Sequence, residues 1–226
     1  MERGHAAFSK EFLATFTNAH PKVFRDFRSA PRTLSKSLPI HDFSEFDVDA
    51  VVHYLREKLQ AIPNGRENAT LFHRTAVSIL DFILYPRLTN PIIEQDIHEG
   101  RKRVDLTFDN GASEGFFLRI PNQARLPCPF IFVECKNYGR EVGNPEIDQL
   151  SGRFSFNRGR VGILVCRSLE DSDLLIQRWR DTHRDGRGLI LPLVDADLES
   201  GLSERASGAE FPLEQRLQEL YTAIAL

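Results

Sequence analysis

A carboxylate and an ammonium group lie two residues apart at the end of an apolar run in this 226-residue sequence. Residues 129–133 (PFIFV) have the composition of a strand buried on both faces, and Glu134, Cys135 and Lys136 follow directly. Because side chains alternate along a strand, Glu134 and Lys136 are predicted to share one face of the sheet and Cys135 the other. A Glu–Lys pair is costly to bury without a purpose, so this stretch is the first candidate for a chemical site.

Asp105 is the second acidic residue that could take part in chemistry. It lies within residues 103–108, where apolar residues occupy every second position, and this alternation predicts an amphipathic strand with Asp105 on its polar face. Residues 91–97 are predicted to form the preceding strand of a hairpin, with residues 98–102 as the turn. Taken alone, an aspartate on such a strand is more often a solvated side chain than a ligand.

The elements around these residues have the order of a mixed α/β sheet. A helix is predicted to begin at Asn144 and end near Gly159, between the apolar strand described above and another at residues 161–166. A strand, a helix and a strand in this order imply a parallel crossover. Residues 115–120 fit either a helix or a strand. The other predicted elements are a helix at 68–85, a helix from 171 or 172 to 183, an edge strand at 189–194 containing Pro192, and a helix at 212–225.

Residues 1–66 are predicted to form a helical N-terminal extension. Phenylalanines at positions 8, 12 and 16 recur every four residues, which favours an amphipathic helix, and residues 47–62 predict a second helix. We predict that residues 67–200 form the core domain and that residues 201–226 contain a C-terminal helix packed on it.

The whole pattern resembles the PD-(D/E)XK nuclease superfamily, whose members have the restriction-endonuclease-like fold. The resemblance covers about residues 68–195 and implies an αβββαβ core between the N-terminal extension and the C-terminal helix. Asp105, Glu134 and Lys136 match the two acids and the lysine of the family motif. The sequence departs from the motif at Val104, where proline is expected, and the interval between the two acids is longer than in the shortest versions.

The resemblance implies an enzyme that hydrolyses phosphodiester bonds of DNA with Mg²⁺, for which Mn²⁺ can substitute. Mg²⁺ prefers hard oxygen ligands and retains several waters, so the carboxylates of Asp105 and Glu134 on adjacent strands would suffice to hold it. By resemblance, the backbone carbonyl of Cys135 is a further ligand and Gln149 is a polar residue near the metal. Lys136 is predicted to orient or deprotonate the attacking water.

Other acidic side chains extend the set of candidate ligands. Asp81 on the predicted helix is either solvated or an accessory ligand, and the sequence leaves open whether Asp81 or Glu94 joins the metal site. Gln149 is equally consistent with an ordinary polar residue on an exposed helix face.

Arginine is abundant in the second half of the chain. Between Arg153 and Arg187 there are eight arginines against five acids, and the forked donors of arginine suit phosphate groups. The alternative is a set of solvated helix and loop side chains. The residues predicted to contact nucleic acid are Arg101, Lys102, Arg103, Arg153 and Arg158.

Composition limits the remaining classes of function. The net charge is −3, which does not fit a polycationic nucleic-acid coat, and the three cysteines form no CxxC pair, which favours reduced thiols over a zinc site. No apolar run approaches the roughly 20 residues that span a bilayer, and the polar N-terminus lacks the apolar core of a signal peptide. We therefore expect a cytoplasmic protein with no membrane partner.

Three functions follow from these residues. The first is a Mg²⁺-dependent DNA endonuclease, with a role in bacterial defence against foreign DNA; RNA as substrate, a homodimer and an activating partner protein all stay open. The second is a catalytically silent domain of the same fold that binds nucleic acid or protein. The third is a metal-independent module in which Glu134 and Lys136 form only a salt bridge. The presence of Asp105, Glu134 and Lys136 together favours the first.

Overall fold

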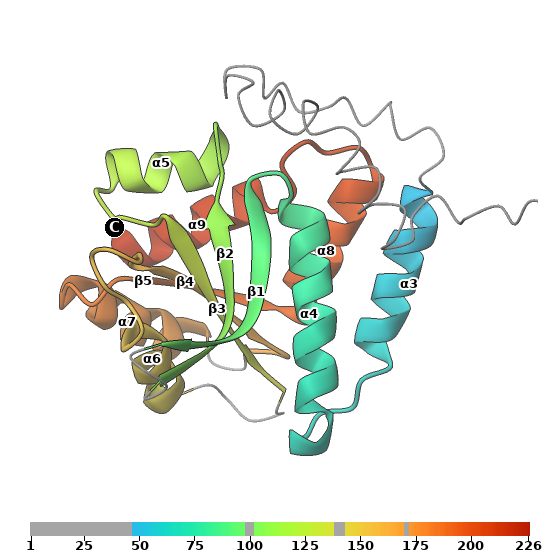
Figure 1. Cartoon of the computed structure of the whole chain (residues 1–226), viewed down its shortest axis with the longest axis horizontal. Coiled ribbons are helices and arrows are strands. Elements are labelled where there is room, and N and C mark those ends of the chain that lie inside the picture. The colour runs from blue at the N-terminus through green and yellow to red at the C-terminus, as the bar shows by residue number, and fades with distance from the viewer. Residues whose placement is uncertain (1–46, 98–101, 138–142, 170–171) are drawn as a thin grey trace, which may run out of the picture. The chain divides into compact units, whose positions relative to one another are not determined.

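A five-stranded mixed sheet with the order β1-β2-β3-β4-β5 organises the structure (Figure 1). The computed structural model describes residues 47–97, 102–137, 143–169 and 172–226, and within these ranges the side chains of 94–97, 102–105 and 172–173 are not described. The pairs β1–β2 and β2–β3 are antiparallel, whereas β3, β4 and β5 are parallel. The strands are β1 (Leu88–Ile97), β2 (Lys102–Asn110), β3 (Phe130–Lys136), β4 (Val161–Cys166) and β5 (Leu189–Val194).

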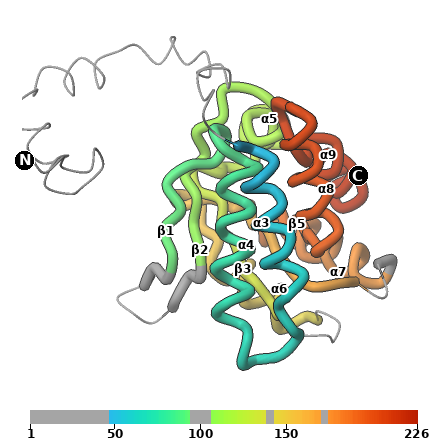
Figure 2. Tube along the Cα trace, turned by 90° about the vertical axis from the view of Figure 1, so that its right-hand side faces the viewer, coloured from blue at the N-terminus to red at the C-terminus, as the bar shows by residue number. Residues whose placement is uncertain are grey.

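Helices cover both faces of this sheet. On one side α4 (Ala69–Leu84) packs on β1 and β3, and α3 (Val48–Gln60) and α8 (Asp195–Ala206) pack on α4 and on each other. Figure 2 shows α3 and α4 in front of the strands. The other side carries α6 (Asn144–Ser151), α7 (Ser172–Arg184) and α9 (Glu214–Ala225), with α5 (Gly115–Gln123) against α9 (Figure 1).

This architecture confirms the predicted α/β fold class with a mixed sheet. The order α4-β1-β2-β3-α6-β4, with α5 inserted before β3, is compatible with a restriction-endonuclease-like αβββαβ core. The parallel pairing of β3 with β4 across α6 confirms the predicted crossover. Because β5 is the last strand of the sheet, Pro192 lies on an edge strand, where the missing backbone N–H is tolerated.

The helix α6 is shorter than the sequence predicted. It ends at Ser151 with Gly152 as its C-cap, so the prediction that it continues towards Gly159 is wrong. The reason lies in the packing of Phe154, whose ring lies 5.7 Å from that of Phe132, measured between centroids. A Cβ atom on Gly162 would lie 3.0 Å from the Phe154 ring, so the absence of a side chain there provides the space for the ring.

Two other segments needed the structure to assign them. Residues 115–120, which fitted either state, belong to the helix α5, in which Phe116, Phe117 and Ile120 are buried. The helix α8 was not predicted. Its buried apolar residues are few, chiefly Leu198 and Leu202, and acidic side chains interrupt the periodic signal on which a sequence-based assignment depends.

The N-terminal region is described only in part. The helix α3 confirms the prediction for residues 47–62, and its capping residue Asp47 accepts a hydrogen bond from the backbone N–H of Ala50 at 2.9 Å. The helix predicted around residues 8–16 lies outside the described residues, and the division at 66/67 and 200/201 stays a prediction. Among the described helices, none is long and apolar enough to cross a membrane.

Candidate functional site

The candidate site lies where the pairing between β2 and β3 ends. The paired register runs from Asp109 with Phe130 to Leu106 with Val133. Asp105 and Glu134 are therefore the next residue along each of two adjacent strands. In Figure 1 the far end of the β1–β2 pair turns away from the end of β3, which continues along β4. The side chain of Asp105 is not described, so its approach to Glu134 stays a prediction.

Glu134 is buried and is bound by two cations. Its side chain is 1% exposed; Lys136 Nζ lies 2.7 Å from one carboxylate oxygen, and Arg153 Nη1 donates to the other. The predicted sharing of one face by Glu134 and Lys136 is confirmed by this contact. The guanidinium of Arg153 arrives from the segment that follows α6, and its side chain is only 5% exposed.

Gln149 holds the lysine from the other side. Lys136 Nζ donates a hydrogen bond of 2.9 Å to Gln149 Oε1, so the structure brings these two candidate residues together, and the position of Gln149 near a metal stays a prediction. Gln149 lies on α6, whose first turn is fixed by Glu146 accepting a hydrogen bond of 2.9 Å from the backbone N–H of Gly143. Gln149, Arg153 and Phe154, whose side chains contact this strand face, come from one short segment.

The electrostatics of the cluster follow from burial. A carboxylate removed from water loses several kcal/mol of hydration, and the attraction of nearby cations offsets this loss only when the geometry is good. Lys136 and Arg153 supply two positive charges, one at each oxygen of Glu134. The three described charges therefore sum to +1, which leaves the site able to accept a further negative charge such as a phosphate oxygen or a second carboxylate.

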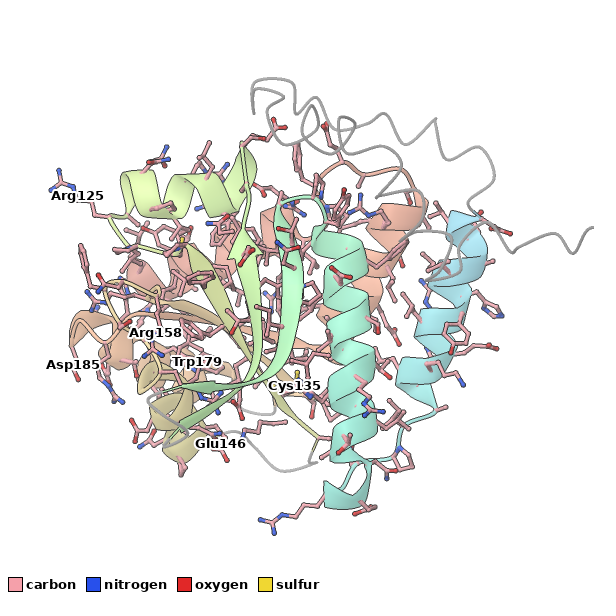
Figure 3. The ribbon with its side chains drawn as sticks, in the orientation of Figure 1. Arg125, Cys135, Glu146, Arg158, Trp179 and Asp185 are labelled. Atoms are coloured by element: carbon pink, nitrogen blue, oxygen red, sulfur yellow. The ribbon has the colours of Figure 1, made fainter. Side chains whose placement is uncertain are left out.

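Cys135 lies on the opposite face of β3. Figure 3 shows it on the side of the sheet that α4 covers, as the alternation along the strand predicted. Its suggested role uses the backbone carbonyl, not the thiol, and stays a prediction. The three cysteines carry free thiols, and burial raises the pKa of Cys128 to about 11 and that of Cys166 to about 12, so these two are unreactive near neutral pH.

The arginines predicted to contact nucleic acid have different surroundings. Arg153 is directed into the protein towards Glu134, which is a different contact from the phosphate contact that we predicted. Arg158 is half-buried and braces a tight turn by donating to Ser155 Oγ at 3.2 Å and to the carbonyl of Arg153 at 3.4 Å. Arg101 lies outside the described residues, and the side chains of Lys102 and Arg103 on β2 are not described.

The two accessory acids remain outside the cluster that the structure describes. Asp81 is half-buried on α4, where burial raises the pKa of its carboxyl group. Glu94 belongs to β1, and its side chain is not described. Whether either joins a metal site therefore stays a prediction.

The donor set fits a hard divalent cation in its chemistry. The described side chains contain no group of three His, Cys, Asp or Glu that could hold a metal, but the search does not extend to the side chain of Asp105. Mg²⁺ needs only one or two carboxylates besides its waters, and a carboxylate such as that of Glu134 offers about four lone-pair sites on its two oxygens. A metal ion bound to Glu134 would be repelled by the positive charges of Lys136 and Arg153.

One functional contact was missed from the sequence. The guanidinium of Arg153 was expected on a nucleic-acid surface, yet it is the second partner of Glu134. Arg153 lies beyond the end of α6 at Ser151, so its spacing of four residues from Gln149 does not place the two side chains on one helix face. No local pattern in the sequence therefore pointed to its contact with Glu134.

Comparisons with known proteins add little to this picture. No protein-family model matches the chain, and no curated protein sequence matches it. Among solved structures the chain is similar to the MspJI restriction endonuclease in complex with a 27-mer oligonucleotide, with 14% sequence identity and a TM-score of 0.37. The match covers 79% of this chain and 36% of that one. At these values the likeness carries no argument, and the fold class rests on the sheet and helix layers described above.

Proposed function

We propose that the chain is a metal-dependent nuclease that hydrolyses phosphodiester bonds of DNA. The observation that carries the proposal is the buried carboxylate of Glu134, held 2.7 Å from Lys136 Nζ at the point where β2 and β3 part and beside the position of Asp105. A strand end that buries an acid and a lysine together, next to a second acid, supplies the groups that hydrolysis of a phosphodiester requires.

Each residue of the cluster has a role in the proposed reaction. Asp105, Glu134 and the carbonyl of Cys135 would hold Mg²⁺ or Mn²⁺, which when bound supplies Lewis-acid polarisation of the phosphoryl oxygen and a more acidic water. Lys136 orients the attacking water through Nζ and offsets the negative charge that develops on the phosphate. Gln149 fixes the ammonium group of Lys136 by accepting its hydrogen bond of 2.9 Å.

A tight turn beyond α6 is the described feature best suited to contact bases. Ser155 and Gly159 exchange two backbone hydrogen bonds, of 3.0 and 2.9 Å, and the turn between them presents Phe156, which is 76% exposed. Gly159 has φ 121°, and a Cβ atom there would lie 2.6 Å from the carbonyl of Phe130, so the base of the turn is packed tightly against β3. The exposed ring of Phe156, two residues before Arg158, can stack on an unpaired or splayed base.

The proposal extends to the setting in which the nuclease acts. Cleavage of foreign DNA in bacterial defence, assembly into a homodimer and dependence on an activating partner are all compatible with it, and RNA is the alternative substrate. The substrate assay below compares DNA with RNA directly.

Cleavage assays test the proposal. Plasmid, linear duplex, single-stranded DNA and RNA are incubated with the full chain and Mg²⁺ or Mn²⁺, in parallel with Lys136→Ala. The proposal expects metal-dependent cutting that falls by at least about a hundredfold in the variant, in line with the loss of a group that assists proton transfer and charge stabilisation. Cutting that persists in a folded Lys136→Ala protein would overturn the assignment of the site.

A second candidate function has its own supporting observation. Glu134 is already satisfied by Lys136 and Arg153 without a metal, as expected for a silent binding domain of the same fold. Such a domain would bind nucleic acid with or without EDTA and would show no heat of Mn²⁺ binding. Mn²⁺ binding that is lost in Glu134→Gln and in Asp105→Asn would exclude it.

A further inference from the structure

Arg153 has a contact that the proposed catalytic chemistry does not use. Its guanidinium donates to one oxygen of Glu134 while Lys136 lies 2.7 Å from the other oxygen. The side chain is 5% exposed, so the ion pair is removed from the screening that weakens surface pairs. Arg153 is therefore a buried positive neighbour of the carboxylate that is proposed to bind the metal.

The position of Arg153 is well determined by its surroundings. The preceding helix ends at Ser151, and the backbone N–H of Arg153 donates 3.0 Å to the carbonyl of Leu150. Its own carbonyl accepts a hydrogen bond of 3.4 Å from Arg158. The next residue, Phe154, is fixed by its packing on Phe132. The guanidinium cannot leave Glu134 without a rearrangement of this segment or a change of its rotamer.

We propose that Arg153 competes with the divalent cation for Glu134 and so limits the affinity of the site for metal. This inference rests on the proposed function, because it concerns the metal of that site. A cation placed against Glu134 is repelled by both Lys136 and Arg153, and the repulsion is large where water is excluded. Lys136 is needed for the reaction, whereas the charge of Arg153 stabilises the empty site and opposes its loading.

If Arg153 competes with the metal, replacing it should have two opposite effects, one on the stability of the metal-free protein and one on the affinity for Mn²⁺. Replacing Arg153 by Met or Gln removes one of the two described cations of the buried Glu134, so the metal-free protein becomes less stable. The same replacement removes a positive charge, so Mn²⁺ binds more tightly and restores the lost stability by mass action. A residue with a purely structural role would show only the first effect.

Calorimetric titration of Mn²⁺ into the full chain, without nucleic acid, tests the inference. Arg153→Met is expected to bind Mn²⁺ at least about tenfold more tightly than the wild type, and Arg153→Lys, which keeps the charge, to stay within about threefold. Arg153→Gln keeps a hydrogen-bond donor and provides a second neutral variant if the methionine protein does not fold. The control is Arg119→Met, because Arg119 lies 2.9 Å from Glu214, another glutamate with two cationic partners.

The outcomes separate the inference from the proposed function. Binding to the wild type with equal or weaker binding to the folded neutral variants would overturn the competition and leave the metal site intact. An absence of Mn²⁺ binding in the wild type and in every Arg153 variant would overturn the metal site, and the competition with it. Tighter binding in Arg119→Met as well would show a non-specific charge effect and would also overturn the inference.

Discussion

Two glutamates in this protein each bind two cations, and the contrast between them separates function from folding. Glu214 on α9 binds Arg87 at 3.2 Å and Arg119 at 2.9 Å, and it accepts a hydrogen bond of 3.0 Å from the backbone N–H of Phe116. Its partners come from before β1 and from α5, so it joins segments far apart in the chain. The described partners of Glu134 lie on β3 and on the segment after α6.

The cluster at Glu214 also includes a buried arginine that contacts a distant part of the chain. Arg87 is 2% exposed, and its second partner is the carbonyl of Pro212 at 2.9 Å. Burial lowers the pKa of Arg87 to about 10, an effect that the negative charge of Glu214 opposes. This cluster holds the C-terminal helix against the core. The described partners of Glu134 lie within 19 residues of it in the chain, and the role proposed for this cluster is chemical.

The largest difference is expected when the glutamates themselves are replaced. Glu134→Gln should abolish metal-dependent cleavage, by about a thousandfold or more, because it removes a proposed metal ligand and the partner of Lys136. Glu214→Gln should leave cleavage by the folded protein unchanged and lower the free energy of unfolding by about 2 kcal/mol. Urea melts and cleavage rates measured on both variants check this. If Glu134→Gln and Glu214→Gln reduced cleavage equally, the two glutamates could not be separated into a catalytic and a structural one.

The buried arginines extend the comparison to stability. Arg87→Met and Arg153→Met each leave a glutamate short of one cation, so each should lower stability by about 3 kcal/mol in metal-free buffer. Millimolar Mn²⁺ should restore much of the loss in Arg153→Met and none of it in Arg87→Met. Thermal melts of each variant in EDTA and in Mn²⁺ measure the loss of stability and its restoration. Restoration of Arg87→Met would mean that the metal acts elsewhere.

Part of this picture was available from the sequence, for identifiable reasons. The apolar run before Glu134 and the alternation around Asp105 predicted two strands, because a period of two survives wherever one face is buried. The relation of Glu134 to Lys136 followed from the same rule. The partnership of Glu134 with Arg153 did not, because it depends on where α6 ends, and that end depends on the packing of Phe154 over Gly162.

The glutamate cluster at Glu214 was outside the reach of sequence reasoning for another reason. Its members are separated by roughly a hundred residues, as the hydrogen bond between Arg87 and Glu214 illustrates with a separation of 127. No local period links such positions. The helix α8 was missed because its periodic signal is weak, although it supplies part of the layer that covers α4.

The glutamines beside the two clusters form a matched pair. Gln149 accepts 2.9 Å from Lys136, and Gln218 accepts 2.9 Å from Arg119. Gln149→Leu should slow cleavage about tenfold, mainly through kcat, because the ammonium group of Lys136 loses its orientation. Gln218→Leu should have no effect on kcat or KM. A loss of activity confined to KM in Gln149→Leu would assign this residue to substrate binding instead.

Asp195 forms a half-buried ion pair with Arg167, outside both glutamate clusters. Its carboxylate lies 3.1 Å from Arg167, yet burial outweighs this attraction and raises the pKa of Asp195 from its usual value near 4 to about 6. Between pH 4 and 6 the folded state thus binds more protons than the unfolded state, so stability falls as pH rises through this window, by at most about 3 kcal/mol. Asp195→Asn should flatten that part of the stability curve. If Asp195→Asn left the dependence of stability on pH unchanged, the raised pKa of Asp195 would be contradicted.

The smallest expected effect is at the exposed turn. Phe156→Ala should weaken binding of single-stranded DNA by about five- to tenfold, since base stacking on an aromatic ring contributes about 1–3 kcal/mol. Phe156→Trp should retain binding, and the fluorescence of the new indole should be quenched by the oligonucleotide. Trp179 is 1% exposed and supplies a constant background. Full binding by the alanine variant would remove the turn from the proposed interface.

The most direct test of the central claim compares one cation from each cluster. Metal-dependent cleavage of plasmid DNA is measured for the wild type, Lys136→Ala and Arg119→Met, each confirmed as folded by circular dichroism. We predict that the wild type and Arg119→Met cut at equal rates and that Lys136→Ala is slower by at least about a hundredfold. Equal cutting by all three proteins would contradict the assignment of the cluster at Glu134 as the active site.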